Sequence, residues 1–170
     1  MKKSIITFAL FLCVGLTAQI GFGQTPKPDD RETLIKAARF LEEKPLDKDA
    51  KNIRGWAMLY IIETKDVSVI ICGGDLTKAA LEKKNKYGSE LLGQYTIGMA
   101  AFKLENPAGA TDENAAQLAG LESMLKSYEV IIKEKPKAKF AGMDDLIKKR
   151  DNGELKAAVE TADCGKKTDK

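Results

Sequence analysis

The chain consists of stretches in which apolar residues recur every three or four positions, separated by short breaks. A spacing of three and four residues places the apolar side chains on one face of an α-helix. The breaks fall at Pro45, Gly73-Gly74, Pro107, Pro136 and Gly153. The pattern predicts an all-α protein with six to seven antiparallel helices, arranged as a stack of helical hairpins or as a bundle.

The segment 87–105 is apolar on nearly every face. A helix of this kind is buried between its neighbours, so we expect it to be the central helix. Gly98 lies in its middle and lowers helix stability by about 1 kcal/mol relative to alanine. We expect another helix to approach closely at Gly98, which would explain why glycine is tolerated there. The side chains predicted to be buried in the core are those of Trp56, Leu92, Tyr95, Met99, Phe102, Leu125 and Tyr128.

Residues 67–72, Val-Ser-Val-Ile-Ile-Cys, form the most ambiguous segment. Their β-branched content favours a strand. An isolated strand would have no partner in an otherwise helical chain, so we predict a short buried helix capped by Asp66. Cap signals at Asp47 and Thr111 predict where two of the longer helices begin.

The N-terminal segment has the three parts of a secretory signal peptide. Lys2 and Lys3 precede an apolar run over residues 5–16, and the run ends with small residues at Gly21 and Gly23. We expect cleavage after Gly23, export to the periplasm or the extracellular space, and no stable membrane insertion of the mature chain. An uncleaved membrane anchor is the alternative, because the run is near the shortest length that spans a bilayer.

These signals divide the chain into four parts: a signal peptide at 1–23, a linker at 24–28, a single helical domain at 29–164 and a flexible tail at 165–170. Of the 28 basic and 25 acidic residues, only two lysines fall in the signal peptide, so the mature chain has a net charge of +1. Such a balance gives no support for a nucleic-acid partner.

Cysteine usage suggests one covalent cross-link. Loss of the signal peptide would remove Cys13 and leave Cys72 and Cys164. An even number of cysteines in an oxidising compartment favours a disulfide. A Cys72–Cys164 bridge would tie the last helix to the core. The alternative is a buried Cys72 and a free thiol at Cys164.

No residue pattern in the chain indicates catalysis. There is no histidine, which excludes Ser-His-Asp and Cys-His catalysis and histidine-ligated metal sites. Asp144 and Asp145 are adjacent, so on a helix they point in different directions and cannot act together as an acid and a base. The sequence therefore predicts no catalytic, metal-binding or cofactor-binding residues, and an enzyme is the less favoured reading.

A short pattern occurs twice in the chain. Glu-Lys-Pro at residues 43–45 recurs as Glu-Lys-Pro at residues 134–136, and in each case a lysine and an alanine follow at the same spacing. In both places a helix is predicted to end at the proline and another to begin after it. Two corners of one kind suggest stacked pairs of helices.

The part of the chain around the second corner resembles tetratricopeptide-type repeats over residues 87–141. Their second helix ends with an aromatic residue followed by proline eight positions later, as Tyr128 and Pro136 do here. Leu92-Gly93 followed by Tyr95 is similar to the Leu-Gly…Tyr of their first helix, with the tyrosine one residue early. No complete repeat is present. The resemblance implies a stack of helical hairpins that binds other proteins.

Together these features favour an exported helical domain that acts in protein–protein interaction or as a scaffold. One alternative is a helical bundle that binds a small apolar ligand in the region of Trp56, Tyr60, Met99 and Phe102; a pocket larger than about 300 Å³ would favour it. A carboxylate-dependent hydrolase of an envelope polymer is the third and least favoured reading. It would need two acids about 5–10 Å apart in a cleft.

Overall fold

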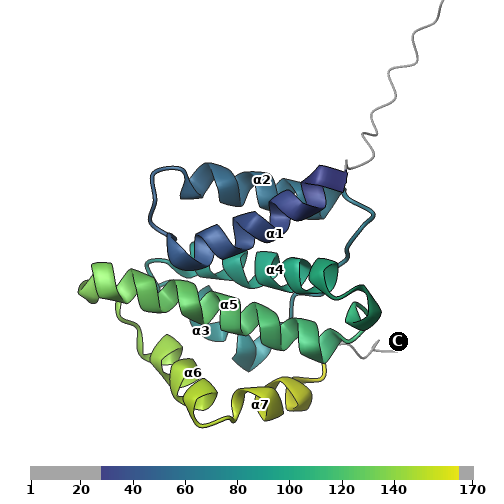
Figure 1. Ribbon diagram of the computed structural model, residues 1–170. Helices are drawn as coiled ribbons and strands as arrows, with labels where there is room; N and C mark the ends of the chain where they lie inside the picture. The colour runs from purple at the N-terminus through teal and green to yellow at the C-terminus, as the bar shows by residue number, and fades with distance from the viewer. Residues whose placement is uncertain (1–27, 165–170) are drawn as a thin grey trace, which may run out of the picture.

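The computed structural model describes residues 28–164, and its regular elements are helical (Figure 1). They are α1 (Pro28–Glu43), α2 (Ala50–Glu63), α3 (Lys78–Leu81), α4 (Gly88–Glu105), α5 (Glu113–Glu134), α6 (Ala141–Asp151) and α7 (Leu155–Ala162), with short 3-10 helices η1 (Gly74–Leu76), η2 (Pro107–Gly109) and η3 (Pro136–Ala138). Over this part of the chain there are seven α-helices and no strand, so the all-α prediction is confirmed. The predicted signal peptide, the linker residues before Pro28 and the predicted tail lie outside the described residues.

Helices α4 and α5 lie side by side in the middle of the fold (Figure 1). Helices α1 and α2 cover one side of this pair, and α3, α6 and α7 lie on the other. Each side has its own hydrophobic core, one built with α1 and α2 and the other with the helices that follow. Because α4 contributes residues to both cores, it must be apolar on more than one face, as its sequence predicts.

The central pair packs closely through glycine. A Cβ atom placed on Gly98 of α4 would lie 2.5 Å from the Cβ of Ser123 on α5. One placed on Gly120 of α5 would lie 2.6 Å from the Cγ of Met99 on α4. Neither distance is compatible with a real side chain, so the two backbones can approach only because both residues are glycine. The expectation of a close helix contact at Gly98 is confirmed.

Four of the seven side chains predicted for the core are buried: Tyr95, Met99, Leu125 and Tyr128. The prediction is wrong for Trp56, Leu92 and Phe102, which are each half-buried. Trp56 lies on α2, an outer helix, where it stacks on Tyr60 with ring centroids 5.8 Å apart. Leu92 and Phe102 belong to the central helix, but each lies on a part of it that neighbouring helices cover only in part. A three-and-four spacing identifies an apolar face without showing how much of that face is covered.

The prediction of a short helix at 67–72 is also wrong. Residues 64–73 form an extended, non-helical connection between α2 and η1, which we call the connecting segment. Side chains of other elements bond its carbonyl oxygens: Lys103 Nζ donates to Ser68 O (2.8 Å), Gln117 Nε2 to Ile70 O (2.6 Å) and Thr77 Oγ1 to Cys72 O (2.7 Å). These partners replace the hydrogen bonds of a helix or sheet, so an extended chain of β-branched residues can lie against a helical core.

Two of the predicted helix caps are displaced. The Asp47 carboxylate accepts a bond from the backbone N–H of Asp49 (2.9 Å) within the turn before α2, and it does not cap the helix. At α5 the cap is Asp112 and not Thr111, because the Asp112 carboxylate accepts from the N–H of Ala115 (2.9 Å). Both Thr111 and Asp112 are residue types suited to a cap, and only the backbone geometry selects between them.

Candidate functional site

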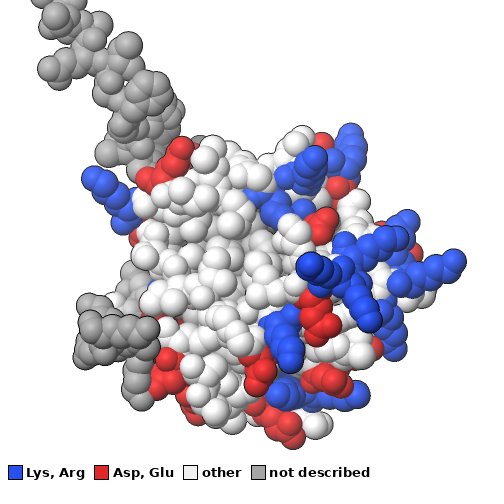
Figure 2. Space-filling model, turned by 180° about the vertical axis from the view of Figure 1, so that it is seen from behind, with Lys and Arg blue, Asp and Glu red and all other residues white. Residues whose placement is uncertain are grey.

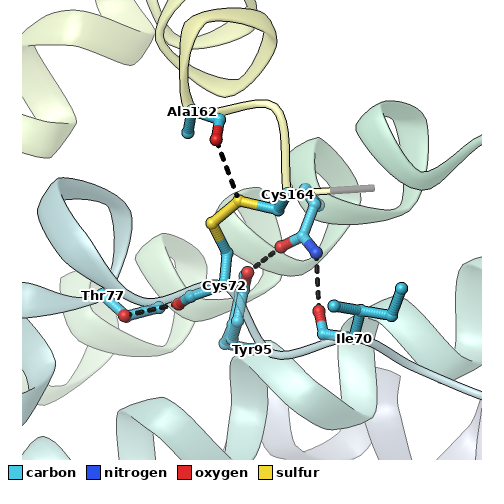
Figure 3. Close-up of a disulfide and its surroundings, with 7 residues drawn as sticks. Ile70, Cys72, Thr77, Tyr95, Ala162 and Cys164 are labelled. Carbon is cyan, nitrogen blue, oxygen red and sulfur yellow. Dashed lines mark hydrogen bonds between the residues drawn. A yellow bond between two sulfur atoms is a disulfide. The ribbon is translucent and has the colours of Figure 1, made fainter. Parts of the chain in front are cut away.

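The two cysteines that the sequence analysis pairs lie together in the structure. The sulfur atoms of Cys72 and Cys164 are bonded, and the Cα atoms lie 5.5 Å apart (Figure 3). This separation is in the usual range for a disulfide. The bridge joins the end of the connecting segment to Cys164, two residues beyond the end of α7, so two segments distant in the sequence are held at one place on the core.

A buried polar cluster lies beside the bridge and bonds to the connecting segment (Figure 3). The hydroxyl of Tyr95 on α4 donates to Gln117 Oε1 on α5, and the amide nitrogen of Gln117 donates to the carbonyl of Ile70. Burial raises the pKa of Tyr95 to about 12, which keeps the phenol a neutral donor. Tyr95 and Gln117 are thus satisfied by structural bonds, and their role is to position Ile70 and its neighbours.

Large apolar side chains are exposed on α2 and on the connecting segment. Leu59 and Ile62 on α2 are 52% and 74% exposed, and Ile70 and Ile71 on the connecting segment are 43% and 51% exposed. We call these four residues the apolar face. Figure 2 shows one face of the molecule with a broad area without charged side chains, with lysines and arginines gathered mainly on its right and acidic side chains along its lower edge. Exposed apolar area of this kind commonly marks an interaction site.

A groove of about 580 Å³ lies next to the apolar face, between α2 and the first half of α4. We call it the α2–α4 groove. Its lining includes Arg54, Gly55, Met58, Ile71, Glu90 and Leu92. Most of the lining surface is apolar, and the charged groups Arg54 and Glu90 lie on opposite helices. Ile71 belongs to both the groove and the apolar face.

Arg54 is the least satisfied charged residue of this groove. Its Nε is buried and has no hydrogen-bond partner, and its Nη2 reaches only the carbonyl of Pro45, at 3.4 Å. Burial lowers the pKa of the Arg54 guanidinium, and the negative charge of Glu90 acts in the opposite direction. Within residues 28–164, Arg54 forms no salt bridge. The sequence analysis did not identify Arg54 as a site residue. The available signal was the presence of glycine at positions 55 and 93, which leaves space around the Arg54 side chain.

A second groove, of about 550 Å³, lies on the outer surface between α1 and α2. Trp56 lines it together with Phe40 and Ile53. Of the four residues predicted to surround a small ligand, the other three do not line this groove or the α2–α4 groove. Tyr60 and Met99 are buried in the cores, and Phe102 is half-buried on α4. The structure therefore does not bring the predicted ligand residues together around either groove.

The carboxylates considered for catalysis are engaged in separate structural contacts. Asp144 accepts a hydrogen bond from the Tyr128 hydroxyl (2.8 Å), and Asp145 pairs with Lys148 (3.1 Å). Burial raises the pKa of Tyr128 to about 12, and its bond to Asp144 acts in the same direction. Over residues 28–164, no group of three or more acids and cysteines is arranged to hold a metal ion.

Glu42 is a buried carboxylate, 7% exposed, and it is fully paired. Arg39 Nη1 lies 2.9 Å from one of its oxygens and Lys126 Nζ lies 3.4 Å from the other. The Ser123 hydroxyl donates to it at 2.7 Å. Glu42 thus joins α1 to α5 and does not have the free, clefted geometry of a catalytic acid.

Comparison with known proteins adds no relative. No protein-family model, no curated protein and no solved structure matches this chain. Among residues 28–164, no helix is both long enough and apolar enough to cross a membrane.

Proposed function

We propose that this protein is an exported helical domain that binds another protein through the apolar face. The observation that carries the proposal is the exposure of Leu59, Ile62, Ile70 and Ile71, between 43% and 74%. Complete burial of one such side chain contributes about 1.5–3 kcal/mol. Four side chains that start about half exposed would therefore contribute about 3–6 kcal/mol when a partner covers them.

The surroundings of the apolar face support a rigid binding surface. Gln117 bonds the carbonyl of Ile70, and the Cys72–Cys164 bridge holds the end of the same segment. A surface that is already ordered loses less conformational freedom when it binds. The resemblance to tetratricopeptide-type hairpins supports a protein partner, and the signal-like N-terminus supports export. A stack of antiparallel helical hairpins is the architecture that this resemblance implies.

The experiment is capture of partners from the native envelope with the immobilised mature chain and two charge variants. Ile62→Lys and Ile71→Lys place a charge in the apolar face, so a specific partner should be lost from both. Leu81→Lys is the matched control, because Leu81 is 59% exposed on α3, outside the apolar face. All three sites are on the surface, so thermal melting should change little. Equal recovery of the same proteins by all three variants would refute the proposal.

Binding of a small apolar ligand is the second candidate function. Both the α1–α2 groove and the α2–α4 groove exceed the volume of about 300 Å³ that is typical of ligand pockets. The α2–α4 groove has both basic and acidic groups in its lining, Lys51, Arg54 and Glu90, at which a ligand could be oriented.

A further inference from the structure

The α2–α4 groove contains a cation, Arg54, whose Nε has no hydrogen-bond partner. The side chain of Arg54 lies across α4 at Gly93, where a Cβ atom would be 3.0 Å from the Arg54 Cδ. Its Nε is buried without a hydrogen-bond partner, and its bond to Pro45 is long. A buried N–H of a charged group that is left unsatisfied is unfavourable, and the planar guanidinium suits a carboxylate. An anionic group at this position would therefore satisfy Arg54.

The rest of the groove suits an alkyl chain. Met58, Ile71 and Leu92 form its apolar surface, and Ile71 is 51% exposed. A peptide strand in the groove would bury backbone N–H and C=O groups that need partners. The uncharged side chains of the lining offer only two hydroxyls, and that of Thr96 already donates to the carbonyl of Leu92 (3.0 Å). A ligand that is polar at one end only fits this surface better than a peptide.

The charge of the groove favours an anion at the polar end. Lys51 and Arg54 on α2 face a single acid, Glu90, in the first turn of α4. The positive end of the α4 dipole lies at the same place and adds to the attraction for an anion. We propose that the α2–α4 groove binds a single-chain fatty acid, with its carboxylate on Arg54 and its alkyl chain along Met58, Ile71 and Leu92. This makes the second candidate function specific and does not depend on the protein partner.

The test is equilibrium binding of hexadecanoate to the mature protein, measured by displacement of a fluorescent fatty acid. Hexadecanol, which has the same chain without the charge, should bind at least about tenfold more weakly. Arg54→Gln should weaken hexadecanoate binding by about tenfold or more, and Arg54→Lys by less. Arg31→Gln is the matched control, because Arg31 is exposed on α1 and pairs with Asp66.

Glu90→Gln separates binding from a merely structural role of Arg54. Removal of this acid leaves the cations of the groove uncompensated, so hexadecanoate should bind several-fold more tightly. If Arg54 served only the fold, Glu90→Gln would leave the affinity unchanged. Equal affinity of the acid and the alcohol, or unchanged affinity in Arg54→Gln, would overturn the proposal.

Gly55→Leu blocks the groove without disturbing the core. A Cβ atom on Gly55 has no neighbour within 4 Å, so a leucine there can enter the groove freely. Binding of hexadecanoate should be lost while the melting temperature stays the same or rises, because leucine is the better helix former. Ile62→Lys, which tests the protein-binding proposal, should leave hexadecanoate binding intact. Retained binding in Gly55→Leu would place the ligand elsewhere and refute the assignment.

Discussion

Replacement of Gly98 by alanine tests the closest contact in the fold. The new methyl group would lie 2.5 Å from the Cβ and 2.8 Å from the hydroxyl oxygen of Ser123. It would also lie 3.3 Å from the Cα of Gly120, so α5 has little room to move. The Ser123 hydroxyl accepts from Gln94 and donates to Glu42, each at 2.7 Å. Displacement of Ser123 therefore disturbs a buried polar cluster that joins α1, α4 and α5.

The expected change in stability is a balance of three effects. Overpacking of a filled core destabilises by about 1–3 kcal/mol. Loss of the hydrogen bond from Ser123 to the Glu42 carboxylate destabilises by about 1.5–3 kcal/mol. Alanine is better than glycine inside a helix by about 1 kcal/mol, which offsets part of this. We expect Gly98→Ala to lower the free energy of unfolding by about 2–4 kcal/mol.

The assay is urea unfolding of the mature protein, followed by far-ultraviolet circular dichroism. Gly55→Ala is the matched control, because it makes the same change on α2 where no atom lies within 4 Å of the new methyl group. It should raise the free energy of unfolding by about 0.5–1 kcal/mol. The two changes thus have opposite signs in one protein. A Gly98→Ala variant as stable as the wild type would show that α4 and α5 do not pack this closely.

Two further predictions concern the cross-link and the buried phenols. Cys164→Ser removes a bridge between residues 92 positions apart and should lower the free energy of unfolding by up to about 4–5 kcal/mol. Amide exchange should rise first in α7, where only Leu155 and Val159 are buried, and unchanged exchange there would contradict this. The pKa values of Tyr95 and Tyr128 are raised to about 12, so stability should be full below pH 10 and fall as the pH rises through about 12. Titration of all phenols near pH 10, followed by absorbance in the folded protein, would be inconsistent with this.

The sequence predicted the helices and the central position of α4 because both follow from local rules. Apolar spacing of three and four residues gives amphipathic helices, and a helix that is apolar on every face must be buried. Gly98 could be linked to a close contact because glycine inside a helix is unfavourable without such a reason. The pairing of Cys72 with Cys164 rested on the count of cysteines, and the tertiary structure has their sulfur atoms bonded.

Only the tertiary structure decided the conformation of residues 67–72 and the partial burial of Trp56 and Phe102. The extended segment depends on hydrogen bonds from Lys103 and Gln117, which lie at least 35 positions further along the chain. No local pattern shows that such partners will be present. No local pattern shows the burial of Arg54 either, because an arginine in an amphipathic helix is ordinarily solvated. Its buried Nε and its groove arise because α4 and the connecting segment pack beside α2, and burial depends on what the rest of the chain brings to a side chain.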